Sequence, residues 1–171
     1  MPDSRAQETG AATDQAVGDW FLAATESPDR SRMEWQDHGV TMLKTGIAFS
    51  AVRMSARLIR AAACTSEAAE VDDYLARALL GGPVICDPHR HWYYALVPAA
   101  DGRSWEATRD VEPLGVGSYV GVPRPGPAGA RSGGRRPYWS VPMGSASNSA
   151  LCVPAAVAAL VDLGLHELAG R

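Results

Sequence analysis

The stretch GPVICDPHRHWYYALVP, residues Gly82–Pro98, decides the fold predicted for this chain. Residues 84–86 are of the β-favouring type, Pro88 imposes a bend, and the apolar run 92–97 resumes the β pattern. Two short apolar runs on either side of a charged, histidine-bearing turn indicate a β-hairpin. The turn of this hairpin is the place where chemistry is expected.

The second strand of the hairpin has two different faces. Side chains alternate along a strand, so His91 and Tyr93 are expected on one face, and Trp92 and Tyr94 on the other. We therefore expect one of these two faces to carry the only plausible polar site of the hairpin.

Helical patterns stand between β patterns along the chain, which predicts a sheet packed by helices rather than a helix bundle. Apolar residues at helical spacing predict helices over residues 13–27, 58–63 and 66–80, and from 154 onward. Two strands are predicted within residues 39–52, two in the hairpin, and one each at 118–122 and 137–141. Residues 29–38 fit a helical turn or a loop, and residues 101–113 fit a connection, either without regular structure or with one helical turn. The predicted fold class is α+β, with a mostly antiparallel sheet.

Length and composition indicate a single domain. The chain has 171 residues, of which 46% are hydrophobic and 20% charged, enough to bury a core of its own. We expect residues 13–171 to form this domain and the polar residues 1–12 to be frayed or disordered. The polar start does not resemble a leader, and no apolar run is expected to approach membrane-spanning length. A cytoplasmic protein without membrane contact is expected.

Cysteine spacing argues against structural cross-links. Cys64, Cys86 and Cys152 are odd in number and widely spaced, so neither a disulfide framework nor a zinc ribbon is predicted, and the thiols are expected to be reduced and buried. Cys86 also forms a Cys-x-x-His-x-His cluster with His89 and His91. Residues this close in sequence reach one zinc ion only if the turn bends. The alternative is a buried thiol beside solvent-facing histidines, and no metal site is predicted.

The charge distribution limits the partners. A net charge of −3 at pH 7 argues against a protein that wraps nucleic acid by charge alone. The arginines are nonetheless uneven, because one Pro- and Gly-rich stretch without any acid holds Arg124, Arg131, Arg135 and Arg136. This stretch is either a basic binding loop or simply a solvated loop.

Two groups of residues resemble a known family. The run His91–Tyr94 followed by Val97–Pro98 resembles the His-x-Tyr-Phe strand of bifunctional primase/polymerase (Prim-Pol) domains of the archaeo-eukaryotic primase superfamily. Gly117–Pro123, a Gly-rich loop and then Tyr138–Trp139 resemble the Gly-Gly-Tyr-Val-Val-x-Pro-Pro run, loop and Tyr-x-Trp strand of the same domains. The whole chain is similar to small actinobacterial proteins that resemble these domains. The resemblance starts near Gly39 and implies an RRM-like core.

The resemblance also implies where a metal site would lie. Primases and polymerases transfer nucleotides with two divalent metals held by carboxylates. The family carries an Asp-x-Asp pair at the strand that corresponds to Gly46–Ser55, but this strand has no acid, and Ser50 and Ser55 stand where related chains carry aspartates. The third family carboxylate corresponds to Glu112, with Asp110 nearby. Glu112 is thus a remnant or an ordinary surface acid. No cofactor is expected, and Mg²⁺ or Mn²⁺ only if the chain is active.

The resemblance assigns His91 to the phosphates of an incoming nucleotide. His89 and Arg90 make the same turn locally basic, although a histidine at a hairpin turn is often only a satisfied surface group. The first hypothesis is therefore a catalytically inactive domain that binds a nucleotide, a single-stranded nucleic acid or a protein partner. The second is an active nucleotidyltransferase that uses Glu112. The third is a structural or complex-forming protein without a ligand.

Overall fold

Strand β2, Phe49–Ser55, is an inner strand of the main sheet and pairs with two strands that follow it in the chain. The computed structural model describes residues 4–103, 105–127 and 134–171. Within them, β2 belongs to a five-stranded antiparallel sheet in the order β5-β2-β4-β3-β7. Its other strands are β3 (Val84–Asp87), β4 (Trp92–Pro98), β5 (Val111–Leu114) and β7 (Tyr138–Val141).

A second, two-stranded antiparallel sheet consists of β1 (Val40–Lys44) and β6 (Tyr119–Pro123). The two strands predicted in residues 39–52 are thus present as β1 and β2, but they belong to different sheets. The turn between them contains Gly46 with a φ of 88°, where a Cβ atom would lie 2.8 Å from the Cα of Val116. Only glycine fits this close passage of two backbones, and it lets the chain move from one sheet to the other.

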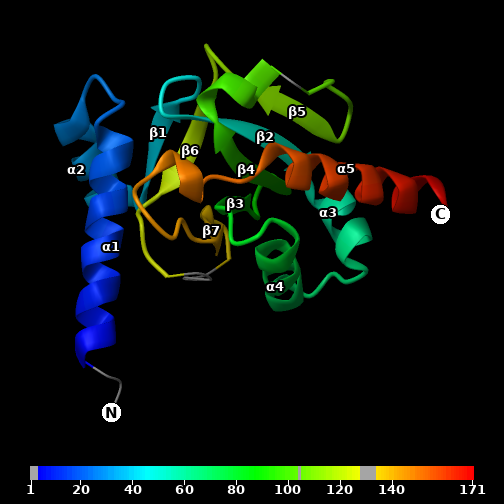
Figure 1. Cartoon of the computed structure of the whole chain (residues 1–171), viewed down its shortest axis with the longest axis horizontal. Coiled ribbons are helices and arrows are strands. Elements are labelled where there is room, and N and C mark those ends of the chain that lie inside the picture. Colours follow the sequence, from blue (N-terminus) through cyan, green and yellow to red (C-terminus); the bar gives the residue numbers. More distant parts are fainter. Residues whose placement is uncertain (1–3, 104, 128–133) are drawn as a thin grey trace.

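In the described part of the chain, five α-helices cover both faces of the five-stranded sheet (Figure 1). Helices α1 (Ser4–Leu22) and α2 (Pro28–His38) lie on one side, together with β1 and β6. Helices α3 (Ala56–Ala63), α4 (Ala68–Ala78) and α5 (Pro154–Ala169) lie on the other side. Two 3₁₀ helices, η1 (Ala99–Arg103) and η2 (Asn148–Ala150), join these elements. The predicted α+β class and the single domain are confirmed.

The alternation of side chains on β2 divides the apolar core in two. Val52 and Met54 point into a cluster formed with α3, α4 and α5, whereas Phe49 and Ala51 point into a cluster formed with α1, α2, β1 and β6. All four side chains are at most 1% exposed. Because both faces of its first half are covered, β2 has the nearly continuous apolar composition of a buried strand.

The hairpin predicted from Gly82–Pro98 is confirmed, since β3 and β4 pair antiparallel on either side of residues 88–91. The prediction that His91 and Tyr93 share one face of the second strand is wrong. Tyr93 is only 4% exposed and belongs to the cluster under α3, α4 and α5. His91 has a φ of 60° and stands before β4, so its exposed side chain does not follow the alternation of the strand.

Three other elements differ from the predictions in extent or type. Helix α1 begins at Ser4, well before Thr13, so residues 4–12 are helical rather than frayed. Of the two alternatives for residues 29–38, a helical turn or a loop, the helical one is present and is extended into α2. Strand β5 lies inside the predicted connection 101–113. It carries a proline and a glutamate, which hide its β character but are tolerated because β5 is an edge strand of the sheet.

One local prediction in the α3–α4 connection is also wrong. Cys64 is exposed rather than buried, because it follows the last turn of α3 in a left-handed conformation with a φ of 55°. The residue that precedes α4 is Glu67, and no side-chain hydrogen bond caps this helix.

The closing helix α5 begins with Pro154 as predicted, and it buries Val157, Leu160 and Val161. It approaches α3 closely at Gly164, where a Cβ atom would lie 2.7 Å from Leu58 Cδ2. The segment Asn148–Ala169 is long and apolar enough to cross a membrane, so the expectation that no run approaches that length does not hold here. Core helices of soluble proteins have the same composition, and packing on α3 accounts for the apolar residues on the inner side.

Candidate ligand site at one end of the five-stranded sheet

One end of the five-stranded sheet brings together the residues that the sequence singles out. At this end Ser55 of β2 and Asp87 of β3 both stand opposite Trp92 of β4. Val111, at the start of β5, stands opposite Met54 on the other side of β2. The hairpin turn and the first turn of α3 therefore meet the start of β5 at this place.

Arg53 and Glu112 form an ion pair on the sheet surface at this end. They are direct partners in the β2–β5 register, and Arg53 Nη2 donates to Glu112 Oε2. The guanidinium carbon of Arg53 also lies 4.5 Å from the ring centroid of Trp92, in a cation–π contact. The side chain of Arg53 is 31% exposed and that of Glu112 is 43% exposed. Glu112 is therefore engaged by a cation rather than being a free surface acid.

Asp110 forms a second and more deeply buried pair beside the first. Its side chain is 8% exposed, and it accepts hydrogen bonds from Arg57 Nε and from Ser55 Oγ, both at 2.6 Å. Arg57 Nη2 donates to the second carboxylate oxygen, so the guanidinium binds Asp110 through two parallel hydrogen bonds. The hydrogen bonds from Arg57 hold the pKa of Asp110 below its ordinary value, although burial opposes this effect.

The two serines that stand at family aspartate positions do not come together. Ser55 lies at the end of β2, where it binds Asp110 and also caps α3 by accepting a hydrogen bond from Leu58 N. Ser50 lies near the other end of β2, fully buried, and donates to the backbone oxygen of Ala99 at 2.9 Å. Aspartates at these two positions would not share a metal ion.

A pair of divalent metals does not fit this end of the sheet. Such a pair needs several carboxylate oxygens with free lone pairs. Here Asp110 is held by Arg57 and Ser55, and Glu112 is held by Arg53. Each acid thus has a positive charge at the place where a metal would have to bind.

The hairpin turn places its basic side chains in solvent next to these pairs. His89, Arg90 and His91 are all exposed, and within the described residues none of them takes part in an ion pair. Two hydrogen bonds fix the turn: Arg90 N donates to Asp87 Oδ1 at 3.2 Å, and the backbone N–H of Ala56 donates to His91 O at 2.8 Å. The second bond ties the turn to the start of α3.

Tyr94 connects the turn electrostatically with the Arg53–Glu112 pair. Burial raises the pKa of Tyr94, and the negative charge of Asp87 raises it further. Arg53 and Arg90 act in the opposite direction, since both favour the phenolate. The Tyr94 hydroxyl therefore lies within the field of both arginines.

The side chains of Cys86, His89 and His91 do not come together at one point in the structure. Cys86 is buried on the α4 side of β3, and burial raises the pKa of its thiol. The two histidines point into solvent from the turn. Among the residues that the structure describes, no three His, Cys, Asp or Glu side chains are placed to hold a metal ion.

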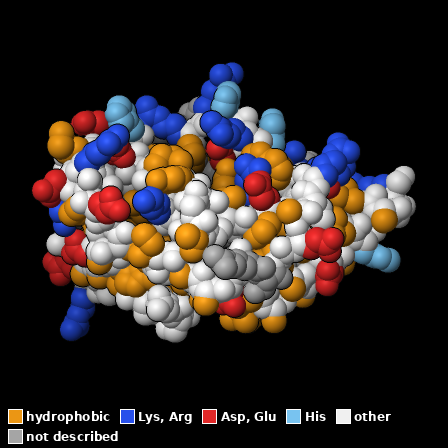
Figure 2. All heavy atoms as spheres, turned by 90° about the horizontal axis from the view of Figure 1, so that it is seen from above, with side chains coloured by type: hydrophobic (Ala, Val, Ile, Leu, Met, Phe, Trp, Pro, Cys, Tyr) orange, Lys and Arg blue, Asp and Glu red, His pale blue; other side chains and the backbone are white. Residues whose placement is uncertain are grey.

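The structure describes three of the four arginines in the basic stretch between β6 and β7. Arg124 and Arg135 are exposed, and Arg136 Nη1 donates to the backbone oxygen of His38 at 3.3 Å. Arg131 lies outside the described residues. Figure 2 shows Lys, Arg and His side chains gathered along one edge of the face that it presents, with acidic side chains interspersed among them.

Comparison of the chain with models of known families, with curated proteins and with solved structures gave no match. The resemblance to Prim-Pol domains therefore stays a prediction that rests on the motifs named above.

Proposed function

We propose that this chain is a non-catalytic binding domain for a phosphate-bearing ligand of the nucleotide class, and that the ligand binds at the end of the sheet near the hairpin turn. One observation carries the proposal: Arg53 and Arg57 each bind one of the two acids nearest the place where a metal pair would lie. This end of the sheet therefore offers guanidinium groups rather than free carboxylates.

Positive charge and geometry support a phosphate ligand. Guanidinium groups bind phosphate through two hydrogen bonds, and each has five N–H donors, so Arg53 and Arg57 keep donors beyond those used by their acids. Arg90 adds an exposed guanidinium from the turn. Its charge acts on the Tyr94 hydroxyl in the same direction as that of Arg53, because both favour the lower pKa of the phenol.

The balance of charges at this end of the sheet supports a small ligand or a short single strand rather than a duplex. The net charge of the chain is −3, and the acids interspersed among the arginines would repel an extended phosphate backbone. Trp92 and Tyr94 are half-buried aromatic rings on the same face and offer a surface for a base.

The strand order of the five-stranded sheet supports the resemblance to Prim-Pol domains, which have an RRM-like core. In an RRM-like core the first strand lies at the centre, between the third and the fourth. Here β2 lies between β4 and β5, with β3 next to β4. The 3₁₀ helix η1 lies where an RRM-like core carries its second helix.

Ligand-dependent thermal stability tests the proposal. Nucleoside triphosphates, with and without Mn²⁺, and short single-stranded DNA are added to the wild type and to Arg90→Ala and His91→Ala variants. A ligand at a hundred times its dissociation constant stabilises the native state by about 2.7 kcal/mol, so binding is easily seen. We expect a shift that does not need Mn²⁺ and that both substitutions reduce. Arg77, on α4, is exposed and has no ion pair with any described residue, so Arg77→Ala is the matched control.

Two results would overturn the proposal. Absence of a shift with every nucleotide and strand would leave a protein partner as the better explanation of the fold. Mn²⁺-dependent incorporation of a labelled nucleotide on a primed template, abolished by Glu112→Ala, would instead show an active nucleotidyltransferase.

A further inference from the structure

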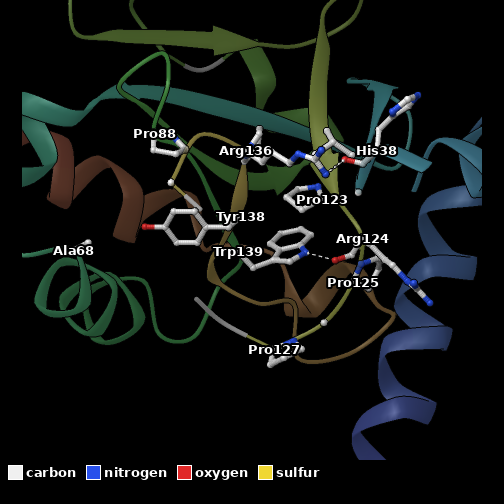
Figure 3. A pocket seen from close by; sticks show the side chains of 15 residues that line it. His38, Ala68, Pro88, Pro123, Arg124, Pro125, Pro127, Arg136, Tyr138 and Trp139 are labelled. Carbon is white, nitrogen blue, oxygen red and sulfur yellow. Dashed lines mark hydrogen bonds between the residues drawn. The ribbon is translucent and has the colours of Figure 1, made fainter. Parts of the chain in front are cut away.

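A pocket of about 490 Å³ lies beside the start of β7, away from the Arg53–Glu112 pair. It is bounded by the hairpin turn at Pro88, by the first residue of α4, Ala68, and by the ends of β1 and β6 (Figure 3). Pockets that hold small molecules in proteins usually measure roughly 300–1,000 Å³. The size of this pocket is therefore in the range of a ligand with one or two rings.

The walls of the pocket are apolar and stiff. Trp139, which is 3% exposed, forms part of the lining, and its Nε1 donates to the backbone oxygen of Arg124 at 3.1 Å, which fixes the indole ring. Proline rings complete the walls, with Pro123 beside the indole and Pro137 before Tyr138. Proline has a fixed φ, which limits the backbone conformations of the segments that form these walls.

The charges around the pocket have one sign. The described residues that line it include His38, Arg124 and Arg136 but no acid, and the sequence from 124 to 136 contains no Asp or Glu. In Figure 3 the side chain of Arg136 extends toward His38 above Pro123 and the indole. Within the described residues, the Arg136 side chain donates one hydrogen bond, to the backbone oxygen of His38. The remaining donors are available to an anion.

We propose that this pocket binds a small molecule with a planar ring system and one anionic group, a carboxylate or a phosphate. The ring lies against Trp139 and the prolines, and the anion binds Arg136. The proposal goes beyond the nucleotide site at the end of the sheet and does not depend on it, because the pocket shares with that site only the hairpin turn, at Pro88.

Calorimetric titration of the full chain with three probes separates the two parts of the recognition. The probes are 2-naphthoate, the uncharged 2-naphthylmethanol and acetate, which lacks the ring. We expect saturable binding of 2-naphthoate, and at least tenfold weaker binding of the other two probes. A parallel titration with adenosine 5′-monophosphate distinguishes a free aromatic acid from a nucleotide as the source of the same ring and charge.

Three variants locate the binding. Arg136→Gln is expected to weaken 2-naphthoate binding about tenfold, as the loss of a hydrogen bond to a charged group does. The neighbouring Arg135 is exposed and does not line the pocket, so Arg135→Gln is the matched control. Ala68→Trp fills the pocket from the exposed start of α4 and is expected to abolish binding, whereas Ala69→Trp, one residue further along this exposed start, is expected to retain it.

The proposal is wrong if the wild type gives no saturable heat with 2-naphthoate, or if Arg135→Gln weakens binding as much as Arg136→Gln. An unchanged affinity of Ala68→Trp for 2-naphthoate would also exclude this pocket as the binding site. The nucleotide site is tested separately, because its variants change Arg90 and His91, which are not among the described residues that line this pocket.

Discussion

The guanidinium of Arg57 binds both carboxylate oxygens of Asp110, and this contact joins the first turn of α3 to the residue before β5. Asp110 is nearly buried, so its charge depends on this partner and on Ser55. The pair therefore contributes to the stability of the fold as well as to the charge of the candidate site.

Arg57→Met is expected to lower the melting temperature by several degrees at pH 7, because it leaves the Asp110 carboxylate without its cation. The loss should depend on pH with a defined sign. The pKa of Asp110 in the folded state is lowered, so the stabilisation is complete above the unfolded-state pKa of about 3.9. It disappears as the pH falls through the folded-state value.

Urea unfolding of the wild type and Arg57→Met between pH 3 and pH 7 checks this expectation. The control is Arg60→Met, one turn later on α3 and exposed without an ion pair. A difference between wild type and Arg57→Met that stays constant over this range would contradict it.

Glu112→Gln is expected to strengthen the binding of a nucleoside triphosphate several-fold at low salt. The substitution removes the negative charge that holds Arg53 and frees its guanidinium for a phosphate. The thermal shift with increasing triphosphate concentration provides the measurement. Weaker binding in Glu112→Gln would favour a metal-dependent site, in which the acid itself is needed.

Gly164→Ala is expected to destabilise the protein by about 1–3 kcal/mol, although alanine favours helices over glycine by about 1 kcal/mol. The added methyl group would lie 2.7 Å from Leu58 Cδ2 and 2.8 Å from Leu58 O, so α5 has to move away from α3. Gly170→Ala is the matched control, since its Cβ would be no closer than 3.7 Å to another residue. Equal unfolding free energies of both variants, measured in urea, would refute this expectation.

The three thiols are expected to react at very different rates with a disulfide reagent. Cys64 is exposed, whereas burial raises the pKa of the Cys152 thiol to about 12 and also raises that of Cys86. Native protein at pH 8 should therefore release one equivalent of product quickly, and Cys64→Ser should remove this fast phase. A fast phase that persists in Cys64→Ser would mean that one of the two buried thiols reaches solvent.

Local sequence signals were enough to predict the elements whose stability is local. The hairpin follows from two β runs around Pro88, and α5 follows from apolar spacing after Pro154. The strand register and the buried face of each element are harder to predict from the sequence, because they depend on the other elements that pack against it. His91, at a positive φ, shows how one residue outside the strand pattern changes a predicted face.

The candidate site was harder to predict because its contacts join residues far apart in the chain. Arg53 pairs with Glu112 only because β5 adds to the edge of β2, and β5 has too few apolar residues to be recognised. The absence of acids from the Gly46–Ser55 strand gives the expectation of a site without a metal pair, and this expectation stays a prediction. Arg57 gave no signal of its own, since an arginine in the first turn of a helix is ordinary until Asp110 is placed beside it.

The hydroxyl of Ser55 has two simultaneous tasks, because it donates to Asp110 and accepts from the backbone N–H of Leu58. Through these two hydrogen bonds, Ser55 links the residue before β5 to the start of α3. Leu58 in turn lies against Gly164 of α5, where an added Cβ atom would be only 2.7 Å from Leu58 Cδ2. The start of α3 therefore contacts both the residue before β5 and the last helix of the chain.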